Sequence, residues 1–510
     1  EDERLTFDSH MRAVQNLARL MQEKFGLRRG DRVAISMRNY PQWPVAFWAC
    51  LVSGYIATPL NSWWTGEELE YGLSDSGARL AIVDDQILER IKPHLASLPA
   101  LENVIVARME SEPDSEKVHA MESLIGRVND WHKLERVGLP ALDLKPDDDA
   151  TIMYSSGTTG RPKGILATHR GIISNMMNSV ANQTRSFLRK GEAPPEPDPT
   201  APQKATLLSI PFFHATGSFA VLVPSFLTGS KIVTMFKWDA GEALPIIERE
   251  KITAFGGVPA IAWQVLEHPD RDKYDLSSVE AVSYGGAPSA PELVSTIKRR
   301  FKEATPANGW GMTETCATAT LNLAEDYINR PDSAGLPGPA MRLKTVDPEG
   351  KTLGPNEIGE LWCFGPANAK LYWNRPDATA ETFVDGWVVT GDLAKIDEEG
   401  FVYLVDRAKD MLIRGGENIY CIEVENAIYS HGDVMDAAVV GIPHKVLGEE
   451  VGAVIQLKPG STLTKEALTD FLSEHLAAFK IPVEVHFQDV PLPRNANGKI
   501  LKKELRERFI

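Results

Sequence analysis

Hydrophobic residues along the first part of the chain follow two spacings. Between Met11 and Met21 they recur every three or four positions, as on one face of a helix, and we expect Gly26 to cap that helix. Shorter apolar runs at 32–37 and 78–83 predict strands. Strands that alternate with helices predict an α/β fold with a largely parallel sheet.

The alternation resumes in the middle of the chain. Apolar runs predict strands at 207–210, 231–235, 252–255 and 279–283, with helical segments between them. We therefore expect a second α/β sheet stacked with the first. A proline-rich, acidic stretch at 185–204 precedes this block and predicts an exposed loop.

From Gly359 onward the pattern changes to short strands among turns. The charged segment that begins at Asp406 is suited to an exposed hinge, and the stretch beyond it has the size of a small domain. We predict a large N-terminal domain at 1–406, made of stacked α/β sheets with a small distorted β-barrel-like part. A small, mobile α+β domain is predicted at 407–510.

Composition and charge narrow the range of functions. Of the 510 residues, 43% are hydrophobic and 24% are charged, which is ordinary for a globular protein. The net charge of −16 gives no general attraction to nucleic acid, so a nucleotide ligand needs a local basic site. Four isolated cysteines and the lack of a long apolar run predict a cytoplasmic protein without a disulfide framework, zinc site or integral membrane segment. The chain starts without a signal-peptide pattern and without an initiator Met, so we expect the native N-terminus to be missing.

One stretch concentrates candidate chemistry, the sequence YSSGTTGRPKG at 154–164. Its glycines let backbone N–H groups approach a ligand, its hydroxyls add donors, and Arg161 and Lys163 add positive charge. An apolar run at 150–154 and a helix expected from His169 predict a strand, a glycine-rich turn and a helix, which is a typical phosphate-binding context. Neither the P-loop pattern nor the protein-kinase motif set is found, which disfavours those ATPases and kinases.

The YSSGTTGRPKG stretch resembles the signature loop of the adenylate-forming superfamily, which includes acyl-CoA synthetases, luciferases and peptide-synthetase adenylation domains. Further stretches match that superfamily in the expected order, and together they cover nearly the whole chain from Tyr154 onward. They are PFFHATG at 211–217, YGGAP at 284–288, NGWGMTET at 308–315, WVVTGD at 387–392, DRAK at 406–409, RGGENIY at 414–420 and PRNANGK at 493–499.

The resemblance implies a site for ATP and Mg²⁺. Glu314 would hold Mg²⁺, which prefers oxygen ligands and substrate phosphates, and Trp310 would stack on the adenine ring. Asp392 and Arg407 would bind the ribose. The complete set of implied ATP and AMP contacts is Ser155, Ser156, Gly157, Thr158, Thr159, Gly160, Lys163, Gly286, Ala287, Pro288, Asn308, Gly309, Trp310, Thr313, Asp392 and Arg407.

The resemblance also implies a pocket for an acyl group. His214 would orient the carboxylate or gate the pocket, and peptide-synthetase domains typically place Asp here, which argues against an amino-acid substrate. Gly311 stands where acetate-specific relatives have Trp, which favours an apolar acid longer than acetate or propionate, either a medium-chain or longer fatty acid or an arylalkanoic acid. The implied pocket residues are Phe213, His214, Thr216, Gly217, Val258, Gly285, Gly311, Met312 and Cys316.

The implied reaction has two steps, formation of acyl-AMP with release of pyrophosphate and then transfer of the acyl group to CoA. Lys409 would be the hinge between the steps, and the catalytic groups would be Lys499, Thr159, Glu314 and His214. The loop that would face CoA contains Arg414, Gly415, Gly416 and Glu417. Two alternatives stay open: transfer to an amine, an oxygen or a carrier-protein thiol, and a non-catalytic protein that binds nucleotide or acyl-adenylate. The oligomeric state, a homodimer included, is also open.

Overall fold

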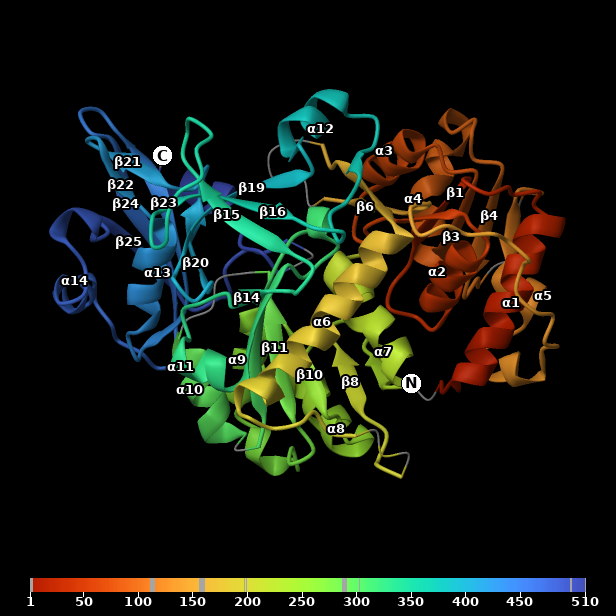
Figure 1. The fold of residues 1–510 in the computed structure, drawn as a ribbon, viewed down its shortest axis with the longest axis horizontal. Coiled ribbons are helices and arrows are strands. Elements are labelled where there is room, and N and C mark those ends of the chain that lie inside the picture. Colours follow the sequence, from red (N-terminus) through yellow and green to blue (C-terminus); the bar gives the residue numbers. More distant parts are fainter. Residues whose placement is uncertain are drawn as a thin grey trace.

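The computed structural model describes residues 3–509, apart from 111–114, 156–160, 197, 199, 287–290, 302 and 496–497. Four β-sheets form its framework, and helices pack around them (Figure 1). Figure 1 shows the first helices in red at one end of the molecule and the C-terminal sheet in blue at the other. Within the described ranges, no helix combines the length and the apolar character that crossing a membrane requires.

The first sheet has eight strands in the order β17-β7-β6-β2-β1-β3-β4-β5. Its strands from β1 to β6 pair in parallel, whereas β7 and β17 join antiparallel. The strands are β1 (Arg32–Ser36), β2 (Ile56–Pro59), β3 (Leu80–Asp84), β4 (Asn103–Ala107), β5 (Val118–Ala120), β6 (Asp149–Tyr154), β7 (Gly164–Thr168) and β17 (Leu371–Tyr372). The helices of this part are α1 (Phe7–Glu23), α2 (Gln42–Val52), α3 (Gly66–Ser76), α4 (Asp85–Ile91) and α5 (Met121–Ile125). The parallel α/β arrangement predicted for the first block is confirmed.

Two local predictions in this part were wrong. Helix α1 ends at Lys24, whose N–H donates to the Leu20 carbonyl, and Gly26 takes its positive φ of 62° two residues farther on. The glycine-rich loop is not followed directly by a helix, because the apolar and largely buried β7 pairs antiparallel with β6. The helix expected from His169 is confirmed as α6 (His169–Arg189), but β7 separates its N-terminus from the loop, which connects the two strands of a hairpin.

The second sheet has seven strands in the order β14-β13-β12-β11-β10-β8-β9 and confirms the second α/β layer. Strands β8 to β12 run parallel to one another, and β13 and β14 join antiparallel. The strands are β8 (Ala205–Leu208), β9 (Lys231–Thr234), β10 (Ala254–Gly257), β11 (Ala281–Gly285), β12 (Thr305–Trp310), β13 (Thr320–Leu323) and β14 (Leu336–Pro337). The accompanying helices are α7 (Val223–Thr228), α8 (Ala240–Glu250), α9 (Pro259–Leu266), α10 (Pro291–Arg300) and α11 (Ala324–Asn329).

Two smaller, mainly antiparallel sheets complete the chain. The third contains β15 (Arg342–Val346), β16 (Gly359–Phe364), β18 (Phe383–Val384), β19 (Trp387–Ile396) and β20 (Val402–Arg407). The fourth contains β21 (Leu412–Arg414), β22 (Glu417–Ile419), β23 (Val434–His444), β24 (Gly448–Leu457) and β25 (Glu484–Gln488). Their helices are α12 (Pro376–Thr382), α13 (Cys421–Tyr429), α14 (Lys465–Ser473) and α15 (Lys502–Arg506). The chain leaves the third sheet and enters the fourth between Arg407 and Leu412.

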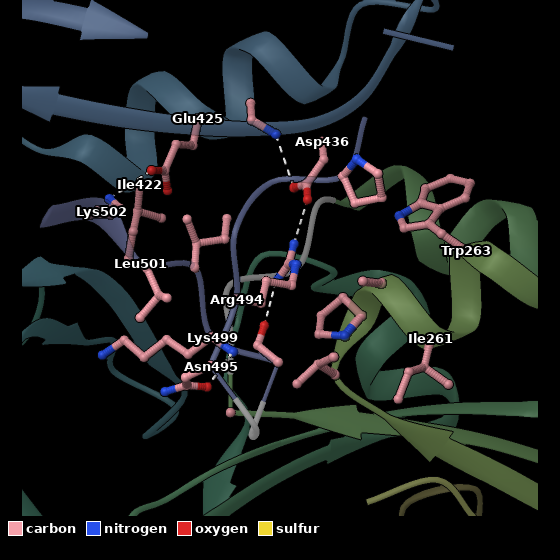
Figure 2. A pocket seen from close by; sticks show the side chains of 18 of the residues that line it. Ile261, Trp263, Ile422, Glu425, Asp436, Arg494, Asn495, Lys499, Leu501 and Lys502 are labelled. Carbon is pink, nitrogen blue, oxygen red and sulfur yellow. Dashed lines mark hydrogen bonds and ion pairs between the residues drawn. The ribbon is translucent and has the colours of Figure 1, made fainter. Parts of the chain in front are cut away.

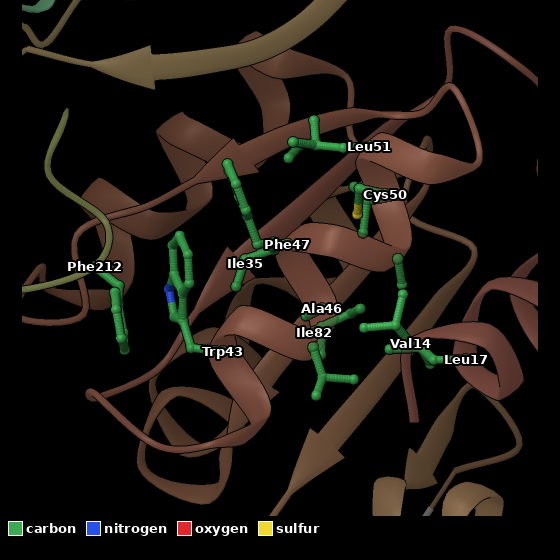
Figure 3. Packing of buried hydrophobic residues seen from close by; sticks show 14 of the residues in the cluster. Val14, Leu17, Ile35, Trp43, Ala46, Phe47, Cys50, Leu51, Ile82 and Phe212 are labelled. Carbon is green, nitrogen blue, oxygen red and sulfur yellow. The ribbon is translucent and has the colours of Figure 1, made fainter. Parts of the chain in front are cut away.

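An aromatic stack in the largest core cluster anchors a segment that the sequence assigned to the site. The Trp43 ring on α2 stacks between Phe47, at a centroid distance of 5.2 Å, and Phe212, at 5.1 Å (Figure 3). Asn39 adds a second anchor, because its side chain accepts from the Phe212 N–H at 2.9 Å and donates to the Ile210 carbonyl at 3.1 Å. The segment that carries His214 is thereby fixed to the first sheet and its helices.

Candidate active site

A cavity of about 1390 Å³ lies where the carboxyl ends of parallel strands from both large sheets meet. Arg38 follows β1, Ser209 follows β8, Val258 follows β10 and Gly286 follows β11, and all four line the cavity. Ligands of α/β proteins bind at such strand ends. The segment Pro491 to Arg506 of the C-terminal region contributes the facing wall (Figure 2).

The residues expected to bind adenine and ribose meet in this cavity. Asn308, Gly309 and Trp310 end strand β12 and line it, as do Asp392 and Arg407, which are direct partners across β19 and β20. The Trp310 indole N–H donates to Asp392 Oδ2 at 2.9 Å, and the Arg407 guanidinium lies 3.4 Å from Asp392 Oδ1. Each oxygen of Asp392 thus has one protein partner and retains lone-pair capacity for a further donor.

The glycine-rich loop can be followed only at its base. The Ser155 N–H donates to the Lys163 carbonyl at 2.9 Å, and the Lys163 N–H donates to the Ser155 hydroxyl at 3.0 Å. Neither side chain lines the cavity. The other predicted loop residues, Ser156, Gly157, Thr158, Thr159 and Gly160, lie outside the described residues, as do Ala287 and Pro288.

Glu314 lies beside the base of this loop. Its side chain is buried and does not line the cavity. The Tyr372 hydroxyl donates to Glu314 Oε1 at 2.6 Å, and the Lys163 ammonium lies 4.7 Å from the centre of the Tyr372 ring. Burial raises the pKa of Glu314, while the Tyr372 hydrogen bond and the charges of Lys163 and Arg407 oppose that rise. Thr313 precedes Glu314 in a short 3₁₀ turn and also lies outside the wall. Tyr372 was missed by the sequence analysis because nothing in its local sequence distinguishes it from a core aromatic.

This arrangement fits a magnesium ion that arrives with nucleotide phosphates. Across the described residues, no group of three or more His, Cys, Asp and Glu side chains is placed to hold a metal by itself. Mg²⁺ typically takes one or two carboxylates and completes its shell with water and phosphate oxygens. The carboxylate of Glu314 retains an oxygen that Tyr372 does not occupy.

Only part of the predicted acyl pocket lines the cavity. Val258, Gly311 and Met312 do, whereas the remaining predicted residues do not; those are Phe213, His214, Thr216, Gly217, Gly285 and Cys316. A Cβ atom on Gly311 would lie 1.7 Å from the Ala317 carbonyl oxygen. Glycine at 311 is therefore required by backbone packing as well as by any tunnel for the acyl chain.

The His214 side chain is fixed in a neutral form. Its Nδ1 accepts a hydrogen bond from the Thr216 N–H at 3.3 Å and lies 3.2 Å from the Thr216 hydroxyl. Burial lowers the pKa of His214 to about 4, so the ring is uncharged at neutral pH. A π-helix, Thr216–Leu222, follows directly, and such turns occur often at functional sites.

Lys499 reaches the cavity from the C-terminal region and meets charged groups of the third sheet and the linker. A Cβ atom on the adjacent Gly498 would lie 2.8 Å from Val258, so this loop contacts the second sheet closely. Burial lowers the pKa of Lys499 to about 8, helped by the like charges of Arg407 and Lys409 and opposed by Asp410 and Asp392. Over the described part of the chain, the Lys499 ammonium makes no hydrogen bond or ion pair.

The residues expected on the CoA side lie elsewhere. Arg414 forms a two-pronged ion pair with Glu450 at 2.7 and 2.9 Å. Gly415 and Gly416, with φ of 61° and 92°, form the two-residue turn that returns the chain to Glu417 on β22. None of these predicted residues lines the cavity, whereas the predicted hinge residue Lys409 does.

Two stacked α/β sheets, a cleft at their strand ends and a lysine supplied by the smaller C-terminal part define a nucleotide-binding enzyme of the adenylate-forming class. The chain belongs to the AMP-binding enzyme family. The family model matches residues 1–373, and the model of the AMP-binding enzyme C-terminal domain matches residues 423–499.

Similar proteins cover nearly the whole chain. A long-chain-fatty-acid–CoA ligase from Bacillus subtilis is 33% identical over 99% of this chain and 90% of its own length. A feruloyl-CoA synthase from Amycolatopsis is 34% identical over 99% of this chain and 94% of its own. The o-succinylbenzoate–CoA synthetase MenE from Bacillus subtilis has been solved in complex with its acyl-adenylate intermediate; this structure has a TM-score of 0.77 and 29% identity, covering 98% of this chain and 92% of its own. A second MenE structure, with ATP and a magnesium ion, has a TM-score of 0.76 and 29% identity, covering 98% of this chain and 93% of its own.

Proposed function

We propose that this protein is an ATP-dependent carboxylate–CoA ligase that activates an apolar acid. In the first step a carboxylate oxygen attacks the α-phosphorus of ATP, a bond to that phosphorus forms, and the bond to pyrophosphate breaks. In the second step the thiol of CoA loses its proton and attacks the acyl carbonyl, and AMP leaves. Relatives that are named as CoA ligases and the acyl-adenylate complex of MenE support this sequence of steps.

One observation carries the proposal, the position of Lys499 in the cavity that Trp310, Asp392 and Arg407 line. Lys499 is partly buried, and its ammonium lacks a protein partner in the described residues, so it is available to a carboxylate and an α-phosphate. A preorganised cation near developing phosphate charge stabilises the transition state and needs no protein nucleophile. His214 lies outside this cavity wall and is neutral, so the proposal gives it a hydrogen-bonding role toward the acid and no proton transfer.

Mg²⁺ is part of the proposal for the first step. Glu314 would hold the ion together with phosphate oxygens, and when bound the ion would neutralise charge on pyrophosphate as that group leaves. Tyr372 orients the Glu314 carboxylate, and Lys163 adds positive charge on the side of the loop.

The second step requires the C-terminal part to move. In the present arrangement Lys499 occupies the cavity while Arg414, Gly415, Gly416 and Glu417 lie away from it. We propose that residues 407–510 rotate about Lys409, which withdraws Lys499 and brings the glycine turn toward CoA. Rotation of one small domain then serves two reactions in one site.

The acid is proposed to be a medium-chain or longer fatty acid or an arylalkanoic acid. Val258, Met312 and the glycine at 311 support an apolar pocket next to the nucleotide residues. Four free, buried cysteines support a cytoplasmic location. Size-exclusion chromatography with light scattering distinguishes a monomer from the homodimer that the sequence left open.

Release of pyrophosphate with Mg·ATP and a panel of carboxylic acids, with and without CoA, tests the proposal. Pyrophosphate and AMP, with acyl-CoA formed only when CoA is present, are expected for the apolar acids. Pyrophosphate release without a thioester would contradict CoA as acceptor and favour an amine or carrier-protein thiol. Nucleotide binding without pyrophosphate release for any acid would contradict catalysis and favour a binding protein.

A further inference from the structure

The loop that presents Lys499 is held by an arginine next to it in sequence. The Arg494 guanidinium donates from one nitrogen to the Gly498 carbonyl, the residue just before Lys499, and from another to the Asp436 carboxylate (Figure 2). Asn495 closes the same loop, since its side-chain oxygen accepts from the Lys499 N–H at 3.0 Å and its carbonyl accepts from the Gly498 N–H at 2.9 Å. Arg494 therefore links the backbone beside Lys499 to a fixed point outside the loop.

Asp436 is itself held in place by further hydrogen bonds. Asp436, near the start of β23, also accepts hydrogen bonds from the Tyr429 hydroxyl at the end of α13 and from the Ala437 N–H at 3.0 Å. The Arg494 and Asp436 side chains are 20% and 11% exposed, so water screens their ion pair only partly. A planar guanidinium can reach both partners at once, which a lysine ammonium cannot do with the same geometry.

A second ion pair holds the chain on the far side of Lys499. The Lys502 ammonium lies 2.7 Å from Glu425 Oε1, and Glu425 also accepts from the Val439 N–H at 2.9 Å. In Figure 2 both pairs lie above Lys499, with Lys502 and Glu425 farther to the left than Arg494 and Asp436. Asp436 and Glu425 belong to β23 and α13, so both anchors lie in the small C-terminal part and would move together with Lys499.

We propose that Arg494 is a positioning residue for the adenylation step, fixing Lys499 through the Gly498 carbonyl and the Asp436 carboxylate. The inference rests on the proposed function, because it assigns Arg494 to only one of the two half-reactions. Lys499 acts in the first step and is withdrawn in the second, so loosening its loop affects acyl-AMP formation selectively. An error of about 1 Å in a catalytic group can cost on the order of 100-fold in rate.

The test measures the two half-reactions separately in Arg494→Met. Single-turnover formation of acyl-AMP from acid and Mg·ATP reports the first, and formation of acyl-CoA from isolated acyl-AMP and CoA reports the second. We expect kcat for the first to fall by roughly 100-fold, with the KM for ATP and the rate of the second changed by no more than about twofold. Arg494→Lys keeps the charge but reaches one partner at a time, so its rate should lie between those of wild type and Arg494→Met.

A matched control removes another ion pair from the same part of the chain. Lys480 contacts both oxygens of Glu423 at 2.6 and 2.7 Å, and neither residue lines the cavity. Lys480→Met should leave both half-reactions within about twofold of wild type. If Arg494→Met does not fold, Asp436→Asn removes the same anchor and should show the same split between half-reactions.

Three results would overturn the assignment. A raised KM for ATP with kcat unchanged would mean that Arg494 contacts the nucleotide directly. Equal losses of rate in both half-reactions would mean that Arg494 has a general structural role. An unchanged rate of adenylation would mean that Arg494 does not position Lys499. Failure of the proposed function is a separate observation, because then wild type and Lys480→Met would also form no acyl-AMP, and the inference would fall with it.

Discussion

Two residues that line the cavity, Lys499 and Trp310, differ in how their polar groups are partnered. Lys499 is a cation in a partly desolvated cavity, close to the like charges of Arg407 and Lys409, and this setting lowers its pKa to about 8. Trp310 is a buried ring whose N–H is committed to Asp392. A partly buried cation without a partner is costly for a protein that binds nothing and useful for one that binds an anionic nucleotide.

The lowered pKa of Lys499 predicts an alkaline limit to adenylation. In its proposed role Lys499 must be protonated to stabilise phosphate charge, so kcat/KM for acyl-AMP formation should be flat below about pH 8 and fall tenfold per unit above it. Bound phosphates favour the charged form of Lys499, so the decrease of kcat should occur at a higher pH than the decrease of kcat/KM. Initial rates of pyrophosphate release between pH 6 and 10, in buffers of constant ionic strength, give both profiles.

Lys499→Arg supplies the control for this profile, since a guanidinium stays charged over the whole range. The activity of Lys499→Arg should be lower than that of wild type, but kcat/KM should no longer decrease above about pH 8. Persistence of that decrease in Lys499→Arg would assign it to another group. Lys499→Ala should bind ATP and form no measurable acyl-AMP.

Replacement of Trp310 tests its contact with the base. Stacking on an aromatic side chain contributes about 1–3 kcal/mol, so Trp310→Ala should raise the Kd for ATP by roughly 5- to 150-fold. Trp310→Phe keeps a ring but loses the hydrogen bond to Asp392, so its Kd for ATP should lie between those of wild type and Trp310→Ala. Isothermal titration with Mg·ATP gives the Kd values, and equal affinity of Trp310→Ala and wild type would exclude the stacking role.

At the scale of elements, the turn after β12 shows how backbone packing shapes the site. Cys316 and Ala317 take positive φ values of 50° and 91°, which non-glycine residues adopt at a cost of about 1–3 kcal/mol each. This turn brings the Ala317 carbonyl against Gly311 and closes the cavity wall there. Strained backbone next to a candidate site is a common feature of functional turns.

Gly311→Ala and Gly309→Ala separate packing from pocket shape. A Cβ atom at 311 would lie 1.7 Å from a backbone oxygen, whereas the nearest atom to one at 309 is a methyl carbon of Thr318 at 3.6 Å. We expect Gly311→Ala to lower the stability of the N-terminal part by about 1–3 kcal/mol or more, and Gly309→Ala to leave it nearly unchanged. Denaturant midpoints from intrinsic fluorescence measure both, and equal midpoints would contradict the clash.

At the scale of the whole molecule, the contact between Gly498 and Val258 defines one of two expected arrangements. This contact places Lys499 among the nucleotide residues of the large N-terminal part. The proposed rotation about Lys409 would break it. In our proposal, the arrangement of the parts determines which half-reaction the molecule can perform.

A disulfide across this contact should trap the adenylating arrangement. The Cβ positions of residues 258 and 498 are 3.5 Å apart, within the range of native disulfides. Oxidised Val258→Cys/Gly498→Cys protein should form acyl-AMP, although the positive φ at 498 strains a non-glycine residue, and it should make little acyl-CoA. Reduction should restore the thioester, as measured by chromatography of the products. The single variants are the controls, and thioester formation by the cross-linked protein would show that the second step needs no rotation.

The sequence by itself determined the features that depend on neighbouring residues. Apolar periodicity located β1, β3, β6 and β8 to β11 but missed β2, β4, β5 and β12. Thr65 and Glu68 form the capping box that starts α3. The ordered motifs identified Trp310, Asp392 and Lys499, and the structure places all three in one cavity. Local spacing is enough for these predictions because each depends on a short segment.

Only the tertiary structure decided how distant segments meet. Trp310 and Asp392 are 82 positions apart, Glu314 and Tyr372 are 58 apart, and so are Asp436 and Arg494. Likewise, residues 164–168 form strand β7 because they pair antiparallel with β6. Such pairings depend on the path of the whole chain, and spacing along the sequence does not encode them locally. The sequence thus determined which groups are available for chemistry, and the packing of four sheets decided which of them share a site.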